Sequence, residues 1–358
     1  MLYQLLYPLH TVYSAFNVFR YITFRTLLAG LTALIISLVL GPRLIRWLTS
    51  KKVGEQIRDD GPERHVAKAG TPTMGGLLIL FSGILATLLL ADLDNSYVWL
   101  VLLTIVGFGA IGFVDDYRKL RGAGSDGLSA RAKFALQVVI ALVVSMLLAA
   151  SPDFSTTLNF PLLKDVRPDL GWWYVPFATF LIVGMSNAVN LTDGLDGLAI
   201  GPVTIAAGTC GIFAYVAGNT RFAEYLQIQY VAGSGELMVF CGAFVAAGLG
   251  FLWFNAYPAQ MFMGDVGSLP LGAALAVVAL VSKQALVLPI LGAVFVIEAL
   301  SVIFQVGSFK TRGKRIFKMA PIHHHFELLG WPEPVIIVRA WIVAVICAIL
   351  ALATLKLR

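Results

Sequence analysis

The chain has 358 residues, of which 58% are hydrophobic and 13% charged, and its formal net charge is +6. Its mean hydropathy of +0.83 excludes an ordinary water-soluble domain and is typical of proteins that cross a membrane repeatedly. The basic residues lie in short loops between apolar runs, where they orient a membrane protein, so we expect no nucleic-acid partner. The three cysteines lie inside apolar runs without paired spacing, which indicates packing rather than disulfides or a zinc site.

Ten apolar runs are long enough to cross a bilayer, which takes about 20 residues in a helix. We therefore predict an all-α polytopic membrane protein with ten transmembrane helices, folded as one domain over residues 1–358. The eighth run is short and rich in glycine, and Pro289 in the ninth predicts a broken or bent helix. The predicted spans are roughly 23–42, 74–91, 97–114, 132–150, 172–189, 198–217, 235–254, 267–282, 286–305 and 335–355.

The number of Lys and Arg residues on alternate sides of these spans predicts the orientation. One side holds 17 of them and the other side, which includes both termini, holds eight. Because basic residues favour the cytoplasmic side, we expect both termini in the periplasm. The loops assigned to the cytoplasm are those at about 43–73, 115–133, 190–197, 255–266 and 306–334.

The polar motifs of the chain all fall on this cytoplasmic side. They are Asp115-Asp116 at the end of the third span, the run from Asn187 to Gly197 after the fifth, Asn255 and Asp265 after the seventh, and His323 to His325 after the ninth. Polar groups at membrane depth are costly and are seldom kept without a use. We therefore predict that several loops converge on one polar site at this face.

The carboxylates of this set can be interpreted as functional or as purely structural. Asp115 and Asp116 lie about 100° apart on a helix, so we expect them to point in different directions, one towards a metal and one towards a nucleophile. A solvated helix end beside Arg118 and Lys119 is the plain alternative. Asp265, between two glycines, can approach an ion or a phosphate, or can serve as a helix N-cap.

The run from Asn187 to Gly197 is a more specific signal. Two asparagines one helical turn apart are followed by two Asp-Gly pairs, which favour tight turns. Such turns present backbone N–H groups and carboxylates to a ligand, although a plain helix-ending loop also explains them. The run has no Lys or Arg, so its carboxylates favour a cation. With the other carboxylates it offers the hard oxygen ligands that suit Mg²⁺.

The histidines and lysines suit phosphate rather than zinc. Consecutive histidines point in different directions, so His323 to His325 are expected to contact phosphate or to support the site. Three lysines at the same face either neutralise phosphate charge or only orient the chain. Glu298, alone in the ninth span, faces either a partner in the bundle or a lipid groove made by a bend at Pro289.

Five motifs occur in a fixed order along the chain. They are Gly70-Thr-Pro-Thr-Met-Gly-Gly76, Phe113-Val-Asp-Asp-Tyr-Arg-Lys119, Asn187-Ala-Val-Asn-Leu-Thr-Asp-Gly-Leu-Asp-Gly197, Met263-Gly-Asp-Val-Gly-Ser268 and Ala320-Pro-Ile-His-His-His-Phe-Glu-Leu-Leu-Gly330. With them, the chain resembles over essentially its full length the phospho-N-acetylmuramoyl-pentapeptide transferase (translocase I) family. That family belongs to the polyprenyl-phosphate N-acetylhexosamine-1-phosphate transferase superfamily.

The resemblance implies transfer of phospho-MurNAc-pentapeptide from UDP-MurNAc-pentapeptide to undecaprenyl phosphate, which releases UMP and forms lipid I. It implies Mg²⁺ as cofactor and a homodimer in the lipid bilayer of the bacterial cytoplasmic (inner) membrane. Matching catalytic positions are Asp115, Asp116, Asp265 and His324, with Asp265 at the metal. Matching substrate contacts are Lys68, Lys119, Lys133, Asn187, Asn190, Asp193, Gly194, Leu195, Asp196, Asn255, His323, His325 and Phe262, whose ring can stack on uracil.

The sequence leaves one alternative mechanism and two alternative functions to consider. Direct attack by the lipid phosphate, with Asp115 or Asp116 positioning or accepting its proton, is preferred to a covalent aspartyl intermediate. A GlcNAc-1-phosphate transferase would share the Asp pair and the membrane plan, but the histidine segment and Pro-Thr-Met-Gly-Gly favour the muramoyl-pentapeptide donor. An ion-coupled transporter usually keeps its carboxylates near the midplane, often in repeated halves, and this sequence has neither feature.

Overall fold

The computed structural model describes residues 1–51, 70–121, 127–163 and 166–356, and the regular elements within these residues are helices. Eight of the described helices are long and apolar enough to cross a membrane, and two apolar helices are shorter. The long helices are α2 (Ile22–Ser50), α4 (Ser96–Arg121), α5 (Ala130–Ala149), α6 (Tyr174–Thr192), α7 (Ile200–Ala217), α9 (Leu237–Asn255), α12 (Ala293–Arg312) and α14 (Glu333–Ala353). The shorter ones are α3 (Gly76–Leu90) and α10 (Asp265–Val281). The prediction of an all-helical polytopic membrane protein is therefore confirmed.

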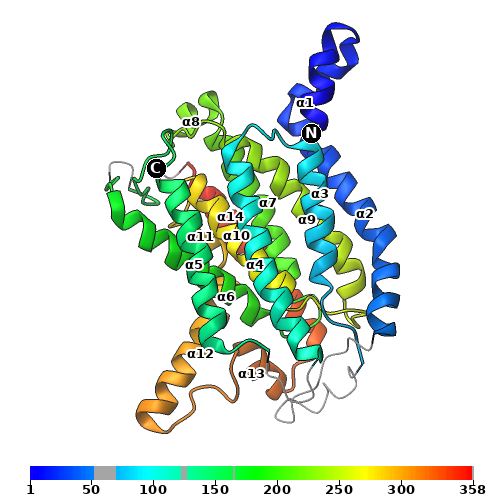
Figure 1. Ribbon diagram of the computed structural model, residues 1–358. Helices are drawn as coiled ribbons and strands as arrows, with labels where there is room; N and C mark the ends of the chain where they lie inside the picture. The colour runs from blue at the N-terminus through cyan, green and yellow to red at the C-terminus, as the bar shows by residue number, and fades with distance from the viewer. Residues whose placement is uncertain (52–69, 122–126, 164–165, 357–358) are drawn as a thin grey trace.

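The ninth predicted span is interrupted, although at Gly292 and not at Pro289, where the break or bend was expected. Pro289 lies in the first turn of the short helix α11 (Leu288–Leu291), a position where its missing N–H costs nothing. The break follows at Gly292, which separates α11 from α12. In Figure 1, α12 then leads away from the bundle at the end opposite α1 (Leu2–Leu6).

Helix α10 forms the centre of the bundle. All of its residues from Val266 to Val281 are buried, and it packs against α3, α4, α6 and α7. A helix enclosed on every side needs apolar residues all round, which explains its lack of a polar face. Close approach depends on glycine, since a Cβ at Gly76 of α3 would lie 2.3 Å from the Cα of Gly267. The core helix therefore carries Asp265, its first residue, to one end of the bundle.

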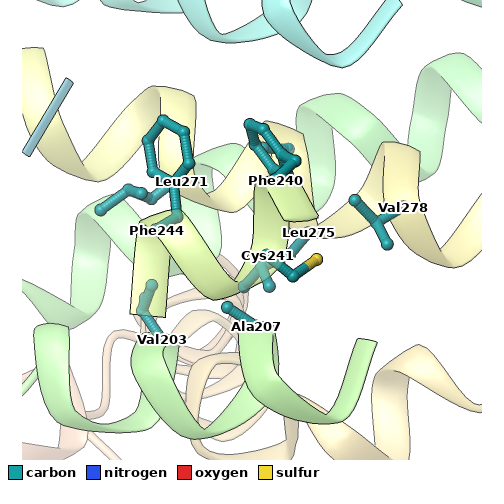
Figure 2. A pocket seen from close by; sticks show the side chains of 9 residues that line it. Val203, Ala207, Phe240, Cys241, Phe244, Leu271, Leu275 and Val278 are labelled. Carbon is teal, nitrogen blue, oxygen red and sulfur yellow. The ribbon is translucent and has the colours of Figure 1, made fainter. Parts of the chain in front are cut away.

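The cysteines are packing residues, as predicted. Cys210, Cys241 and Cys347 are buried and form no disulfide. Figure 2 shows Cys241 among apolar side chains that line a small cavity between α7, α9 and α10. This cavity has no charged lining residue, so it belongs to the core and not to the polar site.

Short helices lie at both ends of the bundle. At one end are α1 and α8 (Thr220–Leu226), and at the other is α13 (Ile322–Leu328), which carries the histidine triplet (Figure 1). One end of the bundle therefore holds the last turns of α4, the start of α10 and helix α13. Of the predicted site residues, Lys68 lies outside the described residues.

Candidate active site

Three carboxylates meet where the end of α4 touches the start of α10. The contact is close because a Cβ at Gly112 would lie 2.2 Å from the carbonyl oxygen of Asp265. One oxygen from each of Asp115, Asp116 and Asp265 lies within 4.8 Å of the others. The expectation that Asp115 and Asp116 point in different directions is thus wrong for their carboxylate groups. Although their Cβ atoms diverge around the helix, both side chains bend towards the start of α10.

Backbone N–H groups hold the two carboxylates of α4. Leu128 N–H donates to Asp115 Oδ1 at 2.7 Å, and Val266 N–H donates to Asp116 Oδ2 at 3.0 Å. Val266 is the second residue of α10, where N–H groups lack partners within the helix. Both carboxyl groups are almost fully buried. Each therefore has one oxygen fixed and the other available to the shared space between them.

Two lysines neutralise this cluster. Lys119 Nζ lies 2.7 Å from Asp115 Oδ2 and 3.3 Å from Asp265 Oδ2, and Lys133 of α5 makes a short contact with the same Asp265 oxygen. Lys133 Nζ also lies 3.6 Å from Asp115 Oδ2. The sequence analysis predicted both lysines at this face, and in the structure their ammonium groups form ion pairs with the carboxylates. Without them, three buried negative charges would repel one another.

Asn190 links the Asn/Asp run to the carboxylate cluster. Its amide nitrogen donates to Asp265 Oδ1 at 2.6 Å and to the Ser268 hydroxyl at 2.8 Å. Asp265 is the first residue of α10 and follows the N-cap residue, Gly264, so the N-cap reading is wrong. Its carboxylate is oriented by Asn190 and the lysines. Ser268 was quoted within a motif, but its role as the second acceptor was not predicted.

Asn187 has a different partner. Its amide nitrogen donates to Gln137 Oε1 at 2.7 Å and to the carbonyl of Val183 in its own helix. Gln137 lies on α5 and was missed by the sequence analysis, although a single amide in a long apolar run was a usable signal. Asn187 therefore joins α6 to α5 beside the cluster rather than entering it.

The turn from Asp193 to Gly197 is held from several sides. Asn255 Oδ1 accepts from Gly197 N–H at 2.9 Å, and Asp196 Oδ2 accepts from Ala259 N–H at 3.0 Å. On α14, Glu333 Oε1 accepts from Asp196 N–H, and Trp341 Nε1 donates to the Gly197 carbonyl. The two α14 residues gave no recognisable sequence signal. The turn is thus a fixed platform and not a loose helix end.

Leu195 and Phe262 lie beside this platform in different environments. Leu195 is buried in a small apolar cluster with Leu198 and Ile336, whereas Phe262 is partly exposed. The backbone of Phe262 pairs with the segment before α3, since its N–H donates to the Pro72 carbonyl and its carbonyl accepts from Gly75 N–H. Phe262 therefore has a fixed backbone and a ring that a ligand can reach.

Each histidine of α13 has its own partner. His323 Nδ1 lies 3.0 Å from Glu298 Oε2 of α12, and His324 Nδ1 lies 2.7 Å from Glu327 Oε2. His325 Nδ1 accepts from Lys318 N–H at 3.1 Å. Glu298 thus faces a partner in the bundle, which decides between the two predicted readings. The three rings point to separate partners, so they do not form one zinc site.

The carboxylate cluster fits a hard divalent cation. Its ligand atoms are all carboxylate oxygens, which come from two buried side chains and the partly buried Asp265 and which already contact two ammonium groups. The described residues that could hold such an ion are Asp115, Asp116 and Asp265. The two lysines show that these oxygens attract cations, and a metal ion bound there would take the place of the ammonium groups.

Comparison with known proteins places the chain in a family. Residues 98–283 match the model of glycosyl transferase family 4, and residues 68–80 match signature 1 of phospho-N-acetylmuramoyl-pentapeptide-transferase. Proteins of that name are similar to the chain over 100% of both lengths: 61% identical in Syntrophus aciditrophicus, 62% in Desulfatibacillum aliphaticivorans and 59% in Geobacter sp.. The first signature covers the segment that pairs with Phe262. The chain therefore belongs to the phospho-N-acetylmuramoyl-pentapeptide-transferase family.

Proposed function

We propose that this chain transfers phospho-MurNAc-pentapeptide from UDP-MurNAc-pentapeptide to undecaprenyl phosphate, releasing UMP and forming lipid I of peptidoglycan synthesis. The observation that carries the proposal is the buried group of Asp115, Asp116 and Asp265 at one end of a membrane bundle, in a chain about 60% identical to such transferases over its full length. A reaction between a water-soluble donor and a lipid acceptor needs a polar site at the membrane surface.

The membrane arrangement is part of the proposal. Ten helices cross the bacterial cytoplasmic membrane, both termini face the periplasm, and the site faces the cytoplasm, where UDP-sugars are available. The excess of Lys and Arg in the loops at the site end supports this orientation. We also propose a homodimer, which native mass spectrometry of the detergent-solubilised protein tests.

Mg²⁺ is the cofactor we propose for the carboxylate cluster. Asp265, with Asp115 and Asp116, would hold it. When bound, the ion would supply positive charge that reduces the repulsion between the pyrophosphate of the donor and the anionic acceptor. Lys119 and Lys133, released from the carboxylates, are placed to contact the phosphates directly.

The reaction we propose is one displacement at phosphorus. An oxygen of undecaprenyl phosphate bonds to the β-phosphorus of the donor, and the bond from that phosphorus to the bridging oxygen breaks, so UMP leaves with the electron pair. A phosphate monoester has its second pKa near about 6, so the acceptor needs little help from a base. Asp115 or Asp116 orients the acceptor and takes its remaining proton. Phe262 contacts the uracil, and Asn190 keeps Asp265 in place.

The covalent alternative is distinguished by rapid quenching. A direct displacement gives no UMP until the lipid acceptor is added. A burst of UMP without acceptor, together with a phosphosugar attached to the enzyme, would replace this proposal with a two-step route.

The function is tested by UMP release in the presence of Mg²⁺. UDP-MurNAc-pentapeptide with undecaprenyl phosphate should give steady release, and UDP-GlcNAc should give little, which separates this activity from that of a GlcNAc-1-phosphate transferase. No release from either donor would leave a transporter as the better reading. Asp265→Ala should lower the rate per folded molecule roughly 10³-fold. Asp94→Ala, an exposed carboxylate at the opposite end, is the matched control.

A further inference from the structure

His323 and Glu298 form a buried pair behind the candidate site. His323 is 1% exposed and Glu298 is 5% exposed, and they join α13 to α12. Glu298 lies in an apolar helix, where a carboxylate is costly unless it is paired. Because the carboxylate accepts at Nδ1, it fixes both the tautomer and the plane of the imidazole.

The other edge of the same ring presses on the turn of the Asn/Asp run. A Cβ added to Gly194 would lie 2.3 Å from His323 Nε2 and 2.8 Å from Cε1. Within the described part of the chain, Nε2 has no hydrogen-bond partner and is closed off from solvent. His323 is therefore packed against the backbone of the turn and is not presented to a ligand.

Gly194 N–H donates to the Thr192 carbonyl within the run at 2.9 Å, and other elements hold the later part of the turn. Asn255, Ala259 and α14 hold Asp196 and Gly197 by hydrogen bonds. The His323 ring covers the turn at Gly194, two residues before these restraints. A ring held rigidly from behind would thus set how far the first Asp-Gly pair can move.

We propose that Glu298 is a positioning residue: it holds the His323 ring against Gly194 and so fixes the turn that receives the UDP-linked donor. This inference rests on the proposed function of that turn. His323 acts through its shape and position, which leaves phosphate contact to other groups of the site. A carboxylate inside α12 thereby controls donor affinity without touching the donor.

The first test compares two variants of Glu298 and a control. Glu298→Leu removes the acceptor and should raise the KM for UDP-MurNAc-pentapeptide on the order of 30-fold, with a smaller change in the KM for undecaprenyl phosphate. Glu298→Gln keeps an oxygen that accepts from Nδ1–H and should stay within about 3-fold of the wild type. Ser301→Ala removes a buried hydroxyl that donates to the backbone carbonyl of Glu298 and leaves the Glu298 carboxylate in place, so it should change neither. Equal loss in the Leu and Gln variants would overturn the proposal.

The second test uses the steric contact and does not depend on the Glu298 variants folding. Gly194→Ala should raise the donor KM because its Cβ meets the ring. In a His323→Ala background the ring is gone, so the same glycine substitution should cost little more. Additive effects of the two substitutions would contradict a direct contact.

Binding measurements separate failure of this inference from failure of the proposed function. UMP affinity of the detergent-solubilised full chain is measured by calorimetry for the wild type and each variant. If the wild type binds UMP but does not turn over UDP-MurNAc-pentapeptide, the proposed function fails while the positioning role is still tested by the affinities. Unchanged UMP and donor affinity in Glu298→Leu, with catalysis intact, would overturn the positioning role alone.

Discussion

Both ends of the bundle bury charged groups, but they bury them in different ways. At the site end, Asp115, Asp116 and Asp265 converge on one small space with two lysines. At the opposite end, Arg25 and Glu236 form a closed pair. Arg25 donates to both Glu236 oxygens, at 2.7 and 2.5 Å, and Glu236 also accepts from Asp92 N–H. Burial of charge alone therefore does not mark a site.

The difference lies in whether like charges share a space. In the bidentate pair, both carboxylate oxygens of Glu236 are occupied by the guanidinium, which leaves little for a ligand. Three carboxylates within 4.8 Å of one another repel, and the ammonium groups of Lys119 and Lys133 offset that repulsion. The first arrangement holds helices together, and the second supports chemistry.

Breaking the closed pair should give the largest effect on folding. Glu236→Ala leaves the buried Arg25 guanidinium without its partner, and we expect a loss of about 3–5 kcal/mol in the free energy of unfolding. Thermal unfolding in detergent measures it. Turnover per folded molecule should remain that of the wild type, because the pair lies at the end away from the site. Specific activity that falls with intact folding would place Glu236 in the catalytic apparatus.

The fold was largely predictable because membrane helices have a strong signal. Each of the ten predicted spans overlaps a helix within the described residues, and a break or bend in the ninth span was expected. Three helices continue well past their predicted ends: α2 from 42 to Ser50, α4 from 114 to Arg121 and α12 from 305 to Arg312. Hydropathy falls at Asp115, but the backbone hydrogen bonds of a helix do not require apolar side chains. The two carboxylates, which were predicted at the end of an apolar helix, are therefore followed by more than one further helical turn.

The site was predictable in its residue types and less so in its pairings. The convergence of Asp115, Asp116 and Asp265 was predicted from a shared membrane side. The partners of Asn187 and Glu298 were not, because a pair such as Glu298 and His323 depends on which faces of two helices meet. Such contacts arise from tertiary packing, and the period of one helix does not contain them.

Removing one lysine of the carboxylate cluster should have an intermediate effect. Lys133→Met removes one of the two ammonium groups on Asp265, and we expect turnover to fall about 10²-fold. The repulsion left among the carboxylates should also lower the melting temperature, and Mg²⁺ should restore it. Lys51→Met, an exposed lysine at the same end, is the control and should show neither change. A melting temperature that does not respond to Mg²⁺ in Lys133→Met would separate the lysine from the metal site.

The smallest effect concerns the pH dependence of stability and comes from Lys283, a buried lysine at the end opposite the site. Lys283, in the turn after α10, donates to the Ser155 carbonyl and lies 3.5 Å from the Phe154 ring centroid. Burial lowers the pKa of Lys283 to about 7, and Asp169 opposes this by favouring the charged form. Between pH 7 and the unfolded value near about 10.4, the unfolded chain binds the extra proton, so stability should rise with pH.

Replacing this lysine should remove that rise. One pKa unit corresponds to about 1.4 kcal/mol, and the ring and the carbonyl offset part of the burial cost. We therefore expect Lys283→Met to flatten the stability curve between pH 7 and 10 by on the order of 2 kcal/mol, as followed by thermal unfolding. Lys356→Met is the matched control, since Lys356 lies over the Tyr225 ring but is exposed to solvent. Parallel curves for wild type and Lys283→Met would show that the lysine folds with its proton, and so resembles the closed pair at the same end.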